Sequence, residues 1–145
     1  MSTERAECYC GNIKAEVLLS KPLTEIVPRA CDCDFCVKHG AEYVSDATGA
    51  MAIRIRNPDK ITLFAQGSRA AEFLICGECG ALFAGTLSID GALRGTLNAR
   101  TLVNKAFLQS AQTASPKRLS RSGKVDRWSQ IWFRRVTIER GAGEC

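Results

Sequence analysis

Cysteine is the residue that most constrains this chain, because eight of its 145 residues are cysteines. The N-terminal residues contain no apolar stretch that would direct the chain to an oxidising compartment, so we expect a cytoplasmic protein. Clustered thiols in a reducing compartment bind metal more often than they form disulfides. Seven cysteines fall in three tight clusters: Cys8 and Cys10; Cys31, Cys33 and Cys36; Cys76 and Cys79. We expect these seven to be metal ligands and Cys145, outside every cluster, to be a free thiol.

The first and last clusters each supply half of a tetrahedral site. Side chains alternate along a strand, so Cys8 and Cys10 point the same way and can clamp one ion. Cys76 and Cys79 form a Cys-x-x-Cys, and their neighbouring glycines permit the tight turn that brings two sulfurs together. Together the two clusters predict a closed four-cysteine structural zinc site.

The middle cluster holds three thiols within six residues, from Cys31 to Cys36. Seven ligands divided as four and three leave a second zinc one protein ligand short, and an open position is typical of catalytic zinc. Asp32, Asp34 or His39 are the alternatives that would close this site.

Other interpretations of the cysteines stay open at this point. They could be small core residues, Cys76 and Cys79 could be a redox pair, and spacing alone leaves an iron–sulfur cluster open. The hypothesis of two zinc ions, one structural and one labile or catalytic, is the one the three clusters favour.

The first hundred residues are punctuated like a β protein. Period-2 alternation and turn residues predict strands over 14–19, 51–56, 61–66, 70–75, 82–89 and 93–99. We expect 61–66 to pair with 51–56 as a hairpin across residues 57–60, a turn at Gly67-Ser68, and a further hairpin at Asp90-Gly91.

Helix is expected only over residues 34–40, with Asp34 as its cap. Residues 109–124 are rich in Ser, Ala, Gln, Lys and Arg and predict a long loop. Residues 125–140 recover apolar content and form either a strand or a helix, and residues 141–145 are expected to fray.

Charge is divided unevenly along the chain. Residues 1–93 carry nine Lys and Arg against twelve Asp and Glu, whereas residues 94–140 carry eleven against two. No apolar run approaches the roughly 20 residues of a membrane span, so we expect no membrane partner.

The ordered cysteine motifs resemble the glutathione-dependent formaldehyde-activating family. These motifs are Cys-x-Cys-Gly from Cys8, Cys-x-Cys-x-x-Cys from Cys31 and Cys-x-x-Cys-Gly from Cys76. The resemblance covers roughly residues 5–104 and includes the supporting segments 36–41, 67–69 and 98–100. The sequence departs from the family pattern at Tyr9 and Asp32, where histidine is common in the family, and after Asn104.

The resemblance implies a mainly β fold, Mss4-like, with twisted antiparallel β-sheets around two zinc sites and little helix over residues 1–104. Residues 105–145 would be a basic C-terminal extension, partly flexible, with either a last strand or a helix. It also implies that Cys8, Cys10, Cys76 and Cys79 hold the structural zinc, and that Cys31, Cys33 and Cys36 hold a labile zinc that meets the glutathione thiol.

The resemblance further implies a carbon–sulfur lyase that joins formaldehyde and glutathione into S-(hydroxymethyl)glutathione. Because glutathione has two carboxylates, cations are expected beside the site, and Arg29, Lys38 and Arg100 are the candidates. A small thiol such as glutathione is thus the expected partner.

The competing hypothesis is a non-catalytic zinc module whose basic tail binds nucleic acid or protein. The tail mixes charge with stacking surface. Its relevant residues are Arg94, Arg100, Lys117, Arg118, Arg121, Arg127, Trp128, Trp132, Phe133, Arg134 and Arg135. A nucleic-acid partner has the lower weight, because the cysteine-bearing part is acidic and repels phosphate.

Overall fold

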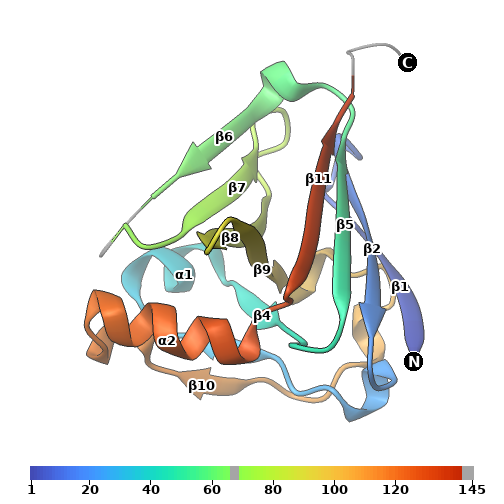
Figure 1. Ribbon diagram of the computed structural model, residues 1–145. Helices are drawn as coiled ribbons and strands as arrows, with labels where there is room; N and C mark the ends of the chain where they lie inside the picture. Colours follow the sequence, from blue (N-terminus) through green and yellow to red (C-terminus); the bar gives the residue numbers. More distant parts are fainter. Residues whose placement is uncertain (66–68, 142–145) are drawn as a thin grey trace.

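The computed structural model describes residues 1–65 and 69–141. Its strands form two sheets, and the expectation of a mainly β fold with little helix is confirmed (Figure 1). Gly67-Ser68, where a turn was predicted, and Cys145 lie outside the described residues. Among the residues described, no helix is long and apolar enough to cross a membrane.

The first sheet has four strands in the order β1-β2-β5-β11. Its members are β1 (Ser2–Glu7), β2 (Ile13–Leu19), β5 (Ala50–Ile55) and β11 (Arg135–Arg140). β2 and β5 alternate buried and exposed side chains, which confirms the period-2 predictions. β11 adds to β5 in parallel, with Val136 opposite Met51.

The second sheet has seven strands in the order β10-β3-β4-β9-β8-β7-β6. They are β10 (Gln112–Ala114), β3 (Arg29–Cys31), β4 (Glu42–Val44), β9 (Ala92–Asn98), β8 (Leu82–Ile89), β7 (Glu72–Cys76) and β6 (Ile61–Phe64). The predicted β8–β9 hairpin is confirmed, and Asp90 and Gly91 turn it with φ of 52° and 79°.

The predicted pairing of residues 61–66 with 51–56 is wrong. β5 is already paired on both sides, by β2 and β11, so β6 pairs with β7 in the other sheet. The turn between β5 and β6 is the 3₁₀ turn Pro58–Lys60. The buried Asn12 side chain holds it, accepting from the Asn57 N–H at 2.8 Å and donating to the Asn57 carbonyl at 3.2 Å.

The first helix, α1 (Asp34–His39), occupies the expected place but is capped differently. The N-cap is Cys33, whose sulfur accepts the backbone N–H of Cys36, and Asp34 lies in the first turn. Gly40 ends the helix with φ of 60°, a conformation that favours glycine.

The predicted long loop over 109–124 is wrong, because this stretch contains β10, the 3₁₀ turn Pro116–Arg118 and the start of α2 (Arg121–Ile131). Residues 125–140 hold both a helix and a strand, where the sequence left the choice open. β10 pairs in parallel with β3. The division at residue 104 stays a prediction, although strands on both sides of it share the two sheets.

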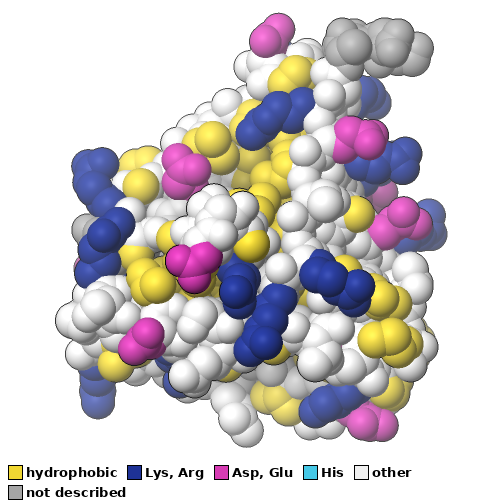
Figure 2. Space-filling view, in the orientation of Figure 1, with side chains coloured by type: hydrophobic (Ala, Val, Ile, Leu, Met, Phe, Trp, Pro, Cys, Tyr) yellow, Lys and Arg dark blue, Asp and Glu magenta, His cyan; other side chains and the backbone are white. Residues whose placement is uncertain are grey.

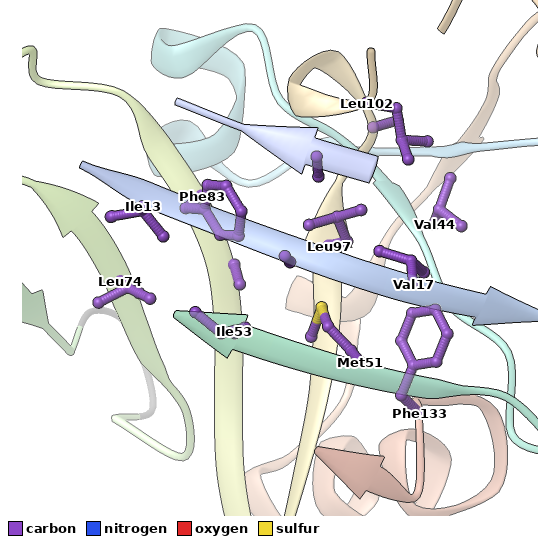
Figure 3. Packing of buried hydrophobic residues seen from close by; sticks show 14 of the residues in the cluster. Ile13, Val17, Val44, Met51, Ile53, Leu74, Phe83, Leu97, Leu102 and Phe133 are labelled. Atoms are coloured by element: carbon purple, nitrogen blue, oxygen red, sulfur yellow. The ribbon is translucent and has the colours of Figure 1, made fainter. Parts of the chain in front are cut away.

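The hydrophobic core lies between the sheets, as Figure 3 shows. Met51 and Ile53 from β5 meet Phe83 from β8 and Leu97 from β9 there. Phe133, which follows α2, is fully buried in the same cluster. Its backbone N–H donates to the Gly95 carbonyl at 2.9 Å, and the Gly95 N–H donates back at 3.1 Å. The segment after α2 is therefore packed into the core.

We predict that Phe133→Ala lowers the free energy of unfolding of the zinc-loaded chain by about 3–5 kcal/mol, because it leaves a cavity between the sheets. Phe107→Ala, at a side chain that is 61% exposed, is the matched control and should change it by less than about 0.5 kcal/mol. Urea denaturation of the two variants measures both. Equal effects would show that Phe133 does not pack in the core.

Candidate metal centres

The first centre joins the two sheets. Cys8 and Cys10 lie in the turn between β1 and β2, whereas Cys76 ends β7 and Cys79 lies in the turn before β8. All four sulfurs lie within 4.8 Å of one another. Residues far apart in the sequence thus form one cluster between the sheets.

The sulfur spacing fits a tetrahedral ion. Zn–S bonds of about 2.3 Å in a tetrahedron place sulfurs about 3.8 Å apart. The Cys8 and Cys10 sulfurs are 3.8 Å apart, and those of Cys10 and Cys76 are 3.6 Å apart. Four thiolates also form the donor set typical of structural zinc. The residues therefore fit this metal.

Both turns of this centre are built alike. The Gly11 N–H donates to the Cys8 carbonyl at 3.2 Å, and the Gly80 N–H donates to the Cys76 carbonyl at 2.8 Å. Both glycines have positive φ, 83° and 79°, which explains why glycine follows each pair of cysteines. Backbone N–H groups also point at sulfur, from Ile13 to Cys8 at 3.3 Å. Such donors stabilise thiolate charge.

The thiols of this centre differ in acidity. Burial raises the pKa of Cys8 to about 12. Burial also raises the pKa of Cys79, but hydrogen bonds, first among them those from the backbone of Cys10 and Ala81, outweigh it and lower this pKa to about 6. Because a metal ion needs all four as thiolates, binding releases protons and weakens as the pH falls.

The second centre consists of Cys31 at the end of β3, Cys33 at the cap of α1 and Cys36 within α1. Their sulfurs also lie within 4.8 Å of one another. The N-cap geometry turns two of them together, because the Cys36 N–H donates to the Cys33 sulfur at 3.4 Å. The buried Tyr43 hydroxyl lies 3.1 Å from the Cys36 sulfur. Sequence reasoning missed this tyrosine, since β4 carries no metal motif.

No Asp, Glu or His within the described part of the chain joins these three sulfurs as a fourth ligand. Asp32 accepts a hydrogen bond from the Ser115 hydroxyl at 2.6 Å. Asp34 is exposed in the first turn of α1. The exposed His39 uses Nδ1 in a hydrogen bond of 2.9 Å with the Phe35 carbonyl. These geometries favour an open coordination position over closure by any of the three.

The thiols of this second centre also differ in acidity. A hydrogen bond with Cys36 lowers the pKa of Cys31 to about 6, and the same interaction together with burial raises the pKa of Cys36. One sulfur is thus favoured as thiolate before any metal binds.

A pocket of about 280 Å³ opens directly beside the three-cysteine centre. β3, α1, β4, β7 and β9 line one wall, and the C-terminal segment, chiefly α2, lines the other. The lining residues are Arg29, Cys31, Cys33, Cys36, Tyr43, Ala71, Phe73, Thr96, Ala114, Pro116, Lys117, Lys124, Arg127, Trp128, Ile131 and Trp132. We call this space the α2 pocket.

Of the three predicted cationic residues, the structure brings only Arg29 to the α2 pocket. Its guanidinium donates to the Ser45 hydroxyl at 2.9 Å. Lys38 is exposed on α1 and is not among the lining residues. Arg100 lies outside this lining too, donating to the Gly40 carbonyl at 2.6 Å and pairing with Glu42 at 3.4 Å. The predicted binding roles of all three stay predictions.

The aromatic residues of the basic tail face inward. Trp128 and Trp132 stack with their ring centroids 4.6 Å apart, and Trp132 and Phe133 are buried. Lys and Arg side chains gather where α2 ends and β11 begins, with hydrophobic side chains beside them (Figure 2). Little of the stacking surface that a nucleic-acid module requires is left on the outside.

No protein-family model matches this chain, and no curated protein matches it. A solved structure that does match is the crystal structure of a Rhodobacter sphaeroides protein determined in a structural-genomics programme. The two chains are 25% identical, the match covers 68% of this chain and 87% of that one, and the TM-score is 0.49. At that level the likeness assigns neither a family nor a function.

We predict that the reduced chain binds two zinc ions with unequal affinity. A chelator should remove the ion at the three-cysteine centre easily, and the other only as the chain unfolds, because the four-cysteine centre ties the sheets together. Zinc analysis with circular dichroism during the titration measures both. A single bound ion at every zinc concentration would contradict a second metal centre.

We further predict that Cys79→Ser destabilises the chain by at least about 4 kcal/mol, because it breaks a closed tetrahedral site. Cys33→Ser should stay folded and lose one zinc ion. Thermal unfolding and zinc content of the two variants separate these outcomes. Equal destabilisation would refute a division into a structural and an exchangeable centre.

Proposed function

We propose that this protein is a zinc-dependent carbon–sulfur lyase that acts on a thiol–aldehyde adduct. The four-cysteine centre holds a structural ion, and the three-cysteine centre holds the ion that meets the substrate thiol. One observation carries the proposal: three clustered sulfurs line the α2 pocket, and no fourth ligand joins them from the residues that the structure describes.

The chemistry is a reversible addition. Zinc, when bound, supplies a Lewis acid that favours the thiolate form of an incoming thiol at neutral pH. The thiolate sulfur attacks the aldehyde carbon and forms the C–S bond, while the carbonyl π electrons move to oxygen. That oxygen takes up a proton equivalent to the one the thiol released, so no redox partner is needed. The reverse step breaks the same C–S bond.

The chain's own residues hold and shield the reacting groups. Cys33 fixes the start of α1 and, through the Cys36 N–H, the spacing of two ligands. The Tyr43 hydroxyl at 3.1 Å orients the Cys36 sulfur. Trp128 and Ile131 of α2 line the opposite wall of the pocket. They restrict the access of water to the open coordination position of the three-cysteine centre.

Two further points support a thiol that carries a carboxylate, with glutathione as the first probe. The order of the cysteine motifs resembles the glutathione-dependent formaldehyde-activating family. In addition, Arg29 lines the α2 pocket together with the three cysteines, and its guanidinium can pair with a carboxylate of the thiol.

Cobalt substitution tests the proposal, because a change from oxygen to sulfur ligation alters the cobalt absorption bands. We predict that glutathione shifts these bands in the wild type and not in Cys33→Ser. In the presence of glutathione, the wild type should also consume formaldehyde faster than glutathione alone does. Cys145→Ser, at the cysteine outside every cluster, is the matched control and should behave as the wild type does.

If no thiol perturbs the cobalt spectrum of the folded, fully loaded chain, the three-cysteine centre is closed. The enzyme hypothesis then fails, and a non-catalytic zinc-binding module takes its place.

A further inference from the structure

The α2 pocket carries an excess of positively charged side chains and no carboxylate among its described lining residues. Four cationic side chains reach it: Arg29, Lys117, Lys124 and Arg127. No Asp or Glu is among the described residues that line it. Because three thiolates around one Zn²⁺ leave a single net negative charge, the loaded centre offsets only part of this excess.

The described residues offer no carboxylate to Arg29, Lys117 or Arg127. The ion pairs found there are Lys60–Glu78 and Arg100–Glu42, both away from the pocket. Lys117 reaches only a backbone oxygen, that of Asp32, at 3.4 Å. A carboxylate or similar anion in the pocket would therefore find donors that the fold itself leaves unneutralised.

Arg29 makes the strongest case among the cations. Its guanidinium donates to the Ser45 hydroxyl, an uncharged acceptor. That hydroxyl also contacts the Thr96 hydroxyl at 2.5 Å. Arg29 is half-buried and has no carboxylate partner among the described residues, so a ligand anion that pairs with it is better shielded from water than one at the surface.

Most of the other lining residues are apolar or aromatic. Tyr43, Phe73, Trp128 and Trp132 contribute aromatic rings, and the two tryptophans stack with an interplanar angle of 16°. An apolar cavity of about 150 Å³ holds benzene, so the pocket of about 280 Å³ has room for a substituted ring. Such rings favour ligands that stack on them.

We propose that the α2 pocket selects an anionic thiol with a flat apolar body and no ammonium group, such as a mercapto-substituted aromatic carboxylate or its aldehyde adduct. This rests on the proposed function for the sulfur end of the ligand and narrows its substrate class. Glutathione brings an ammonium group along with its carboxylates, and the lining offers that group no carboxylate.

The two tryptophans of the chain both line the pocket, so indole N–H signals in NMR spectra report its occupation directly. The probes are 4-mercaptobenzoate, its neutral methyl ester, glutathione and benzoate, each titrated into the zinc-loaded full chain. We expect 4-mercaptobenzoate to bind at least about tenfold more tightly than the ester or glutathione, since its carboxylate adds charged hydrogen bonds that the ester lacks and it brings no ammonium group. Rising salt should reduce the difference.

A pair of variants on α2 controls for general charge. Arg127→Gln removes a lining cation and should weaken 4-mercaptobenzoate about tenfold while leaving the ester unchanged. Arg121→Gln removes an exposed cation of the same helix outside the lining and should leave both unchanged.

The outcomes separate the two proposals. Equal binding of acid and ester, tighter binding of glutathione, or equal effects of the two variants would overturn the anion selectivity, even if thiols shift the cobalt bands. Conversely, benzoate that moves the indole signals and is weakened by Arg127→Gln supports the anion site. If no thiol then shifts the cobalt bands, the proposed function alone fails.

Discussion

The four-cysteine cluster is the constraint on which the architecture depends, because it is where the two sheets are tied. Cys8 and Cys10 belong to the first sheet's β1–β2 turn, and Cys76 and Cys79 to the β7–β8 turn of the second. An ion held by these four thiolates closes a loop of more than sixty residues. Closing a loop of this length removes entropy from the unfolded chain, as a disulfide of similar span does.

The C-terminal segment supplies the surroundings of the second, three-cysteine centre. β11 extends the first sheet beside β5, and β10 extends the second sheet beside β3. α2 is held between these two attachments, with the fully buried Phe133 following it. Both ends of the segment pair with strands, and α2, drawn below α1 in Figure 1, lines the same pocket as the three cysteines.

The sequence allowed the chemistry of the ligands to be predicted better than their surroundings. The three cysteine motifs and the Asp90-Gly91 turn are local patterns, and their conformations depend little on distant parts of the chain. The partner of β6 was mispredicted because pairing is decided by which edges remain available, which residues near the turn do not encode. α2 has Ser, Gly and Lys in its first turns and no buried residue, so no apolar periodicity marks it. Tyr43 reaches Cys36 only through the pairing of β4 with β3.

Two centres built from the same kind of ligand thus differ for reasons outside the ligands. In the first, the two sheets each bring two sulfurs, and four thiolates around one ion would leave no position for a substrate. In the second, one local stretch supplies three sulfurs, and the element that faces them, α2, offers Lys, Arg and Trp side chains rather than a fourth ligand. The element that covers the cluster therefore determines what can approach it. Reactivity at the second centre would be a property of α2 as much as of the cysteines.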